Sequence, residues 1–190
     1  QVMEWVGKRS YSFNSIIRAL QNQFKGIKDN QRLPIFNQNK DNSHTHALII
    51  GGGPTALTHS HAIQKYLITN PDICVIHASS KNAMSFKSIP NKQIFCLVGN
   101  EGHRMEDVFQ GEILKGAICI LPTYPRKMGT YIPASLKKSA FELASITFAD
   151  KFMDSHTTIA LQTAIELETD TITIIGYDGY SESLIGKKEQ

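Results

Sequence analysis

The sequence has 190 residues, of which 41% are hydrophobic and 19% are charged, values typical of one folded domain with a full hydrophobic core. The formal net charge is only +3, and no basic stripe carries interleaved aromatic residues, which argues against nucleic acid as a partner. No apolar run is long enough to span a membrane and no signal peptide is visible, so we expect a cytoplasmic protein that does not bind membranes.

The first 46 residues are expected to lie outside the main domain. Residues 1–25 carry apolar side chains at helical spacing from Phe13 to Phe24, and we interpret them as the helical tail of a preceding domain or as a helix that packs on this one. Residues 26–46 are polar and indicate a linker. Because the chain begins with Gln1 and ends in a polar stretch, we expect it to be a piece of a longer protein.

Five short apolar runs follow, and each ends in glycine, proline or polar residues. They are rich in β-branched residues and do not alternate with polar ones, which is typical of strands that are covered on both faces in a parallel sheet. Three of them contain a cysteine (Cys74, Cys96 and Cys119). An odd number of widely spaced cysteines favours buried free thiols in a reducing compartment over a disulfide framework or a metal cluster. The predicted strands are residues 47–50, 73–76, 94–98, 117–121 and 172–175.

Helical patterns over residues 54–69 and 157–167 separate some of these strands. Alternation of strands and helices predicts an α/β domain over residues 47–190, with a Rossmann-like, open and mostly parallel sheet of about five or more strands flanked by helices. Residues 123–154 are less regular and could contain a short helix, an extra strand or a lid.

Polar residues follow all five predicted strands, and ligands bind beyond the carboxyl ends of strands in open parallel sheets. These residue types bind phosphate and sugar, although loops in a purely structural domain are also polar. A general base could be His103 or His156, and Arg104 and Arg126 could act as charge clamps. The remaining candidates at the strand ends are His77, Ser79, Asn82, Asn100, Glu101 and Asp178.

The first strand ends in a glycine-rich loop, Gly51–Gly53, followed by Pro54 and Thr55. Proline is favoured at the first helical position, so Gly53 should be the N-cap residue. Glycines let the backbone approach a ligand closely, and free N–H groups at a helix start favour an anion. The amides of Gly52 and Gly53 would contact phosphate. The loop matches neither the Walker motif nor the dinucleotide fingerprint, so a plain tight turn remains the alternative.

A second helix start lies near residues 154–158. Asp154 or Ser155 can cap this helix, and capping can be its whole role. In the functional interpretation, Ser155, His156 and Thr157 face the same ligand as the glycine loop. Asp178 could bind a ribose hydroxyl or magnesium, or close the turn with Gly179.

Two of these motifs resemble those of a known superfamily. Residues 48–55 and 154–180 resemble the two signatures of the MptE-like pterin pyrophosphokinases, the flagellin glycosyltransferases of the motility accessory factor type and bacterial sialyltransferases. The resemblance implies that Gly51, Gly53, Pro54 and Thr55 hold nucleotide phosphates. It also implies that Ser155, His156, Thr157 and Asp178 line the same pocket. Thr55 stands where serine is usual, and no residue here matches the family's catalytic base.

The whole chain is also similar to the C-terminal domain of aldolase proteins related to hydroxymethylglutaryl-CoA lyase and 4-hydroxy-2-oxovalerate aldolase. The similarity lies in residues 5–20, 100–104 and 124–131. It implies that an aldolase-like domain precedes this one and that the barrel's catalytic residues are absent from this chain.

These observations leave more than one function open. The first hypothesis is a domain that binds a nucleotide or nucleotide sugar, and whether it is an enzyme, such as a glycosyl- or phosphoryl-type transferase, stays open. The second is a non-catalytic module that assembles or regulates an attached aldolase (lyase). The third is a metal-dependent pyrophosphokinase with Glu101, Asp154 and Asp178 as magnesium ligands, although their spacing shows no known pattern. Oligomerisation is also possible.

Overall fold

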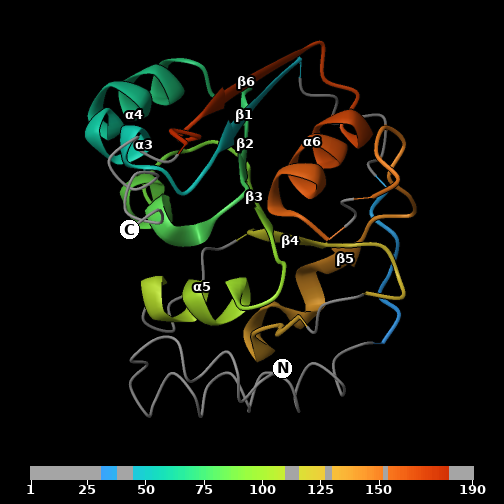
Figure 1. Cartoon of the computed structure of the whole chain (residues 1–190). Coiled ribbons are helices and arrows are strands. Elements are labelled where there is room, and N and C mark those ends of the chain that lie inside the picture. The colour runs from blue at the N-terminus through green and yellow to red at the C-terminus, as the bar shows by residue number, and fades with distance from the viewer. Residues whose placement is uncertain (1–30, 38–44, 110–115, 127–129, 152–153, 180–190) are drawn as a thin grey trace, which may run out of the picture.

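A computed structural model describes residues 31–37, 45–109, 116–126, 130–151 and 154–179. In this part of the chain six strands form one sheet, in which every neighbouring pair is parallel and the order is β5-β4-β3-β2-β1-β6. Helices flank the sheet, so the chain has an open, Rossmann-like α/β fold (Figure 1). The predicted tail over residues 1–25 lies outside the described residues.

The strands confirm the interpretation of the apolar runs. Their bounds are β1 (His46–Ile50), β2 (Cys74–His77), β3 (Gln93–Cys96), β4 (Ile118–Leu121), β5 (Ala140–Glu142) and β6 (Thr171–Ile175). Strand β5 lies in the irregular span over residues 123–154, where an extra strand was one of the possibilities. Strands β2, β3 and most of β4 are buried on both faces, as continuous apolar runs predict.

The helices differ more from the prediction than the strands do. The pattern over residues 54–69 forms two helices, α3 (Pro54–Thr58) and α4 (Ser60–Thr69), which are separated at His59. Helix α6 (His156–Glu166) agrees with the prediction to within one residue. Helix α5 (Glu101–Phe109) and the 3-10 helix η2 (Ser80–Phe86) occupy segments that were not predicted to be helical, whereas the 3-10 helix η3 (Ala134–Ser139) lies in the span over residues 123–154, where a short helix was one of the possibilities.

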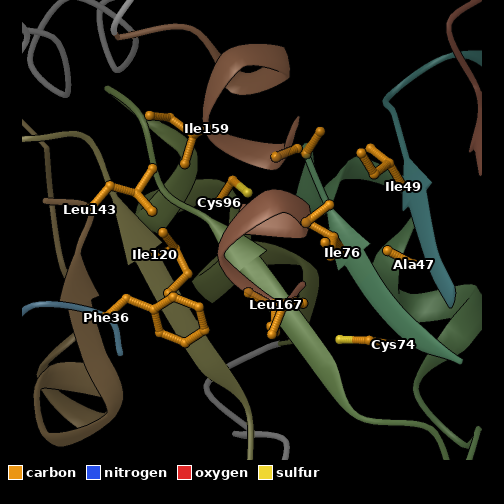
Figure 2. Close-up of a cluster of buried hydrophobic side chains, with 14 of the residues drawn as sticks. Phe36, Ala47, Ile49, Cys74, Ile76, Cys96, Ile120, Leu143, Ile159 and Leu167 are labelled. Atoms are coloured by element: carbon orange, nitrogen blue, oxygen red, sulfur yellow. The ribbon is translucent and has the colours of Figure 1, made fainter. Parts of the chain in front are cut away.

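Side chains alternate between the two faces of the sheet and build separate clusters. On one face, Ala47, Ile49, Ile76 and Ile120 form one hydrophobic cluster with Ile159 of α6 (Figure 2). On the other face, α3 and α4 cover β1 and β2, and α5 covers β3 and β4. The cysteines Cys74, Cys96 and Cys119 are buried free thiols in these clusters, as predicted, and burial raises their pKa values.

The two edges of the sheet differ in how they are covered. Residues 31–37, part of the predicted linker, lie beside β5, where Phe36 N–H donates to the Glu142 carbonyl at 2.8 Å and the Phe36 ring enters the core. Strand β6 forms the opposite edge, and most of its side chains are exposed. Its sequence resembles those of the inner strands in its apolar, β-branched residues. β-Branched residues favour a strand whether it lies at the edge or in the centre of a sheet, so composition does not indicate the position.

Candidate functional site

The strand order brings the loops after β1, β2 and β6 together. The chain progresses from β1 to β5 in one direction and then returns through α6 to place β6 beside β1. The β1/β6 boundary is therefore the topological switch point of the sheet, which is the usual position of a ligand site in open α/β folds. The candidate site lies at this boundary and extends toward the start of α5.

The glycine loop is held by hydrogen bonds to its neighbours. Gly51 N–H donates to the Ile175 carbonyl and Gly53 N–H to the Gly176 carbonyl, both at 2.8 Å. The Asn82 side-chain amide donates to the Gly53 carbonyl at 2.9 Å and to the Gly51 carbonyl at 3.3 Å. Two amides of the loop, including the predicted phosphate contact at Gly53, are thus already paired, and Asn82 acts on the loop rather than toward solvent.

Asp178 occupies the start of α3. Gly53 is the N-cap residue and Pro54 the first helical residue, as predicted. The Asp178 carboxylate accepts a hydrogen bond from Thr55 N–H at 3.0 Å, so the helix start already faces an anion from the protein itself. Among the described residues, Gly52 N–H has no hydrogen-bond partner. One amide of the loop therefore stays available to a ligand, next to a carboxylate that can accept hydrogen bonds from hydroxyl groups.

The close contact between the glycine loop and the end of β6 makes Gly51 sensitive to substitution. A Cβ atom at Gly51 would lie 2.5 Å from the Gly176 carbonyl oxygen and 2.9 Å from the Tyr177 ring. We therefore expect Gly51→Ala to lower the free energy of unfolding by about 1–3 kcal/mol, measured by urea denaturation. Gly52→Ala is the matched control, because its Cβ would meet the Ser79 hydroxyl at 3.2 Å, which can rotate away. Equal effects of the two substitutions would contradict this difference in packing.

Glu101 is the centre of a polar cluster that joins three loops. Its carboxylate is 2% exposed and accepts hydrogen bonds from the backbone N–H of Ser80, from the Ser80 hydroxyl at 2.7 Å and from the Ser79 hydroxyl at 3.2 Å. The Arg104 guanidinium lies 2.7 Å from the Glu101 carboxylate, and His156 Nε2 lies 3.3 Å from it. The structure thus brings five predicted or adjacent residues from the loop after β2, from α5 and from α6 into direct contact.

The Glu101 carboxylate is stabilised in its charged form. Burial pushes the pKa of Glu101 upward, but the nearby His156 imidazole, the hydrogen bonds from Ser80 and the charge of Arg104 outweigh burial, so its pKa lies below the ordinary value. The charged carboxylate fixes the positions of Arg104 and His156, whose side chains are 48% and 41% exposed. Both groups are therefore oriented by a buried anion while they remain accessible to a ligand.

Arg104 and the glycine loop are linked through Ser79. Arg104 Nη1 also donates to the Ser79 hydroxyl at 3.3 Å. That hydroxyl lies close to Gly52, and the Lys81 side chain lies next to it, 3.8 Å from the position of a Gly52 Cβ. Nη2 and Nε of Arg104 bond to no other described residue. A continuous polar surface thus runs from Gly52 through Ser79 to Arg104 and His156.

Tyr177 is a site residue that sequence reasoning missed. Its ring packs against Gly51. Burial raises the pKa of Tyr177, and the nearby Thr157 side chain opposes this effect only in part. Tyr177 therefore lies between the glycine loop and the start of α6. The available signal was an aromatic residue two positions after a predicted strand and directly before Asp178. Ser80 and Lys81, which were not selected either, lack a comparable signal because serine and lysine are common in loops.

Of the two residues predicted as possible caps of the second helix, Asp154 and Ser155, the structure has Ser155 in this position. The Ser155 hydroxyl accepts from Thr158 N–H at 3.1 Å and donates to the Thr158 hydroxyl at 2.8 Å. Ser155 is thus the N-cap residue, and its hydroxyl is engaged within the helix. Thr157 is exposed in its first turn, and Asn100 is exposed at the start of α5.

Two predicted histidines are placed away from this cluster. His77 is fully buried, where its ring stacks on Phe95 with 4.5 Å between centroids and Nε2 contacts Gln93 Oε1 at 2.9 Å. Burial lowers the pKa of His77 to about 4. His103 stacks on Tyr131 with 3.7 Å between ring centroids, and its Nδ1 lies 3.9 Å from Glu106. Both histidines thus contact residues other than Glu101.

Arg126, a third predicted site residue, forms a buried ion pair. Its Nη2 lies 3.0 Å from Glu142 Oε2, and both terminal nitrogens donate to the Gln31 carbonyl at 2.9 and 3.0 Å. Both partners of the pair are nearly inaccessible to solvent. The Arg126 guanidinium therefore joins residues 31–37 to β5 instead of standing at the ligand edge.

The described residues contain no group of three or more His, Cys, Asp or Glu side chains that could hold a metal ion. The three candidate magnesium ligands, Glu101, Asp154 and Asp178, thus do not form such a group. Glu101 is instead engaged by Arg104 and His156, and Asp178 by Thr55 N–H. In the same part of the chain, no helix has the length and apolar character needed to cross a bilayer.

Comparisons with known proteins leave the two family resemblances as predictions. No protein-family model matches the chain, no curated protein matches its sequence, and no solved structure matches its fold with significance.

Proposed function

We propose that this domain binds a nucleotide or nucleotide sugar at the carboxyl ends of β1 and β6 and serves a glycosyl- or phosphoryl-type transfer reaction. The observation that carries the proposal is the buried Glu101 carboxylate, which orients Arg104 and His156 beside the glycine loop. A buried carboxylate that positions two accessible, nitrogen-bearing side chains is typical of a preorganised site for an anion.

The polar surface divides into parts suited to the two ends of such a ligand. Gly52 N–H, the Ser79 hydroxyl and the Lys81 ammonium would contact phosphate oxygens, with Arg104 as the charge clamp. Asp178 lies beside the same loop and would accept hydrogen bonds from sugar hydroxyls. His156 would serve as the base that receives the acceptor's proton through Nδ1, because Nε2 is buried against Glu101 while the side chain as a whole is 41% exposed. Any magnesium would arrive with the nucleotide.

Titration calorimetry with CMP, UDP, ADP and their sugar conjugates, each with and without Mg²⁺, tests this proposal. We expect at least one of these compounds to bind the full chain. Arg104→Met should weaken binding of that compound about ten- to a hundredfold, since hydrogen bonds to a charged group contribute about 1.5–3 kcal/mol. Gly52→Val should block the approach of phosphate to the loop.

Lys138→Met is the matched control, because it removes one exposed positive charge from η3, which precedes β5 and so lies at the opposite edge of the sheet. We expect this variant to bind as the wild type does. Circular dichroism establishes that each variant is folded. A folded wild type that binds none of the nucleotides or nucleotide sugars would refute the proposal.

A second candidate function is supported by the pairing of the glycine-loop amides. Gly51 and Gly53 donate to the end of β6, as expected for a structural turn. The domain would then be a non-catalytic module that assembles or regulates a preceding aldolase-like (lyase) domain. This candidate predicts no nucleotide binding and no effect of Arg104→Met or Gly52→Val on the aldolase activity of the longer protein. For both candidates we propose a cytoplasmic location, since the cysteines of the domain are unpaired.

A further inference from the structure

The β6 edge is the feature of the fold that the proposed function does not use. In the described part of the chain β6 pairs with β1 alone, whereas residues 34–36 cover β5 through hydrogen bonds to both backbone groups of Glu142. Natural sheets protect open edges with charged residues, proline or bulges. Strand β6, Thr-Ile-Thr-Ile-Ile, has no charged residue and no proline. One edge of this sheet is thus covered by its own chain, and the other is built like a strand that pairs further.

The outward-facing groups of β6 can be assigned from its bonds to β1. Thr171 N–H donates to the Thr45 carbonyl at 3.1 Å, and the Ile175 carbonyl accepts from Gly51 N–H at 2.8 Å. Because backbone groups alternate in direction along a strand, Thr171, Thr173 and Ile175 face β1, and Ile172 and Ile174 face outward. The N–H and C=O groups of Ile172 and Ile174 have no partner among the described residues. A protein segment that pairs with these groups would be another extended strand.

We propose that the occupant is β6 of a second copy of this chain, in antiparallel orientation about a two-fold axis at Thr173. In this register Ile172 of one copy lies opposite Ile174 of the other. Each of these pairs exchanges both of its hydrogen bonds, and the two Thr173 residues form the pair between them. Ile172 and Ile174, whose backbone groups face outward, are therefore the residues that form the hydrogen bonds between the two copies. The two sheets join into one continuous sheet across the axis.

The side chains of β6 fit the same arrangement. Ile172 and Ile174 are 37% and 48% exposed and lie in register with Ala47 and Ile49, on the face that α6 covers. The two-fold axis is perpendicular to the sheet, so the four isoleucines of the two copies meet on one face. Cross-strand pairs of β-branched residues stabilise antiparallel sheets, and no like charges oppose each other within the paired strands. A strand with this pattern is complementary to itself, which favours a second copy over an unrelated partner.

Sedimentation velocity over a range of protein concentrations tests the dimer with the full chain. We expect the wild type to form a discrete dimer. In Ile172→Lys/Ile174→Lys, introduced ammonium groups face each other across the axis, so dimerisation should weaken about tenfold or more. In Ile172→Lys/Ile174→Glu, an ammonium of one copy faces a carboxylate of the other, and the dimer should recover. Both variants alter exposed positions, and circular dichroism checks that they fold.

A cysteine scan tests the register itself. Non-hydrogen-bonded antiparallel partners have Cα atoms about 4.5 Å apart, which is within the range of a disulfide. Thr173→Cys should therefore form an intermolecular disulfide on oxidation, whereas Thr171→Cys should not, because its two copies lie about four residues apart along the strands. The three native cysteines are buried and are present in both variants, so any cross-linking through them should be equal in the two.

Several outcomes would overturn the dimer. They are a folded wild type that stays monomeric, a dimer that persists in the Lys/Lys variant, a Lys/Glu variant no better than Lys/Lys, or equal cross-linking at positions 171 and 173. None of these measurements involves a nucleotide, so a result that refutes the dimer leaves the proposed function untouched, and the reverse also holds.

Discussion

Arg126→Met is expected to lower the free energy of unfolding by about 3–5 kcal/mol, because it leaves a buried charge without its partner. The guanidinium and the Glu142 carboxylate are 1% and 2% exposed and lie 3.0 Å apart. Removing the guanidinium leaves a buried carboxylate whose remaining described contact is Leu33 N–H, at 3.0 Å. The Gln31 carbonyl loses its donors as well. Urea denaturation measures the change.

A double variant separates the ion pair from simple packing. Arg126→Met/Glu142→Leu removes both charges, and well-packed apolar replacements of buried ion pairs are often neutral in stability. We expect the double variant to be more stable than either single variant. The exposed Lys138→Met should change stability by no more than about 0.5 kcal/mol. A double variant that loses the sum of the two single effects would show that the charges do not interact.

The second large effect is a pH dependence that His77 imposes. Burial lowers the pKa of His77 from 6.5 to about 4. The unfolded chain therefore binds a proton at this residue below about pH 6.5, while the folded chain does so only near pH 4. The contribution of His77 to stability is fully present above about pH 6.5, and stability falls by about 3 kcal/mol as the pH drops toward about 4. Denaturation midpoints between about pH 7 and pH 4 measure this loss.

His77→Phe isolates this contribution. The variant keeps an aromatic ring against Phe95 and Phe86, and it cannot titrate. Loss of the hydrogen bond to Gln93 lowers stability by the same amount at every pH. All other ionisable residues are the same in the two proteins, so the difference between the two curves reports His77 alone. Parallel curves for the wild type and His77→Phe would contradict the buried, neutral state of this histidine.

Both His77 and Arg126 have the sequence features of ligand-contact residues, and their placement shows where sequence reasoning reaches its limit. Each follows or ends a strand at its carboxyl end, as a ligand-binding residue would. What removes them from the site is burial beside Gln93 in one case and beside Glu142 in the other. A polar residue at a strand end looks the same in sequence whether it faces solvent or a buried partner.

The glycine loop shows a similar division. Its tight turn, the N-cap at Gly53 and the helix start at Pro54 follow from local conformational preferences and were predicted. The engagement of its amides was not, because the partners lie far along the chain: Asp178 is 123 residues from Thr55. Local sequence specifies the shape of such a loop, and the neighbouring strand determines which of its groups remain available.

Local sequence patterns were sufficient to predict the α/β class, five of the six strands, helix α6, and the buried state of the three cysteines. Continuous β-branched runs, helical spacing and capping residues act over a few neighbouring residues, so they can be recognised without the fold. The position of β6 as an edge strand beside β1, the pairing of β5 with β4, and the cluster of Glu101 with Ser80, Arg104 and His156 emerged only once the chain was folded. These features depend on contacts between segments distant in sequence, whose energies arise from burial and pairing that no local pattern encodes.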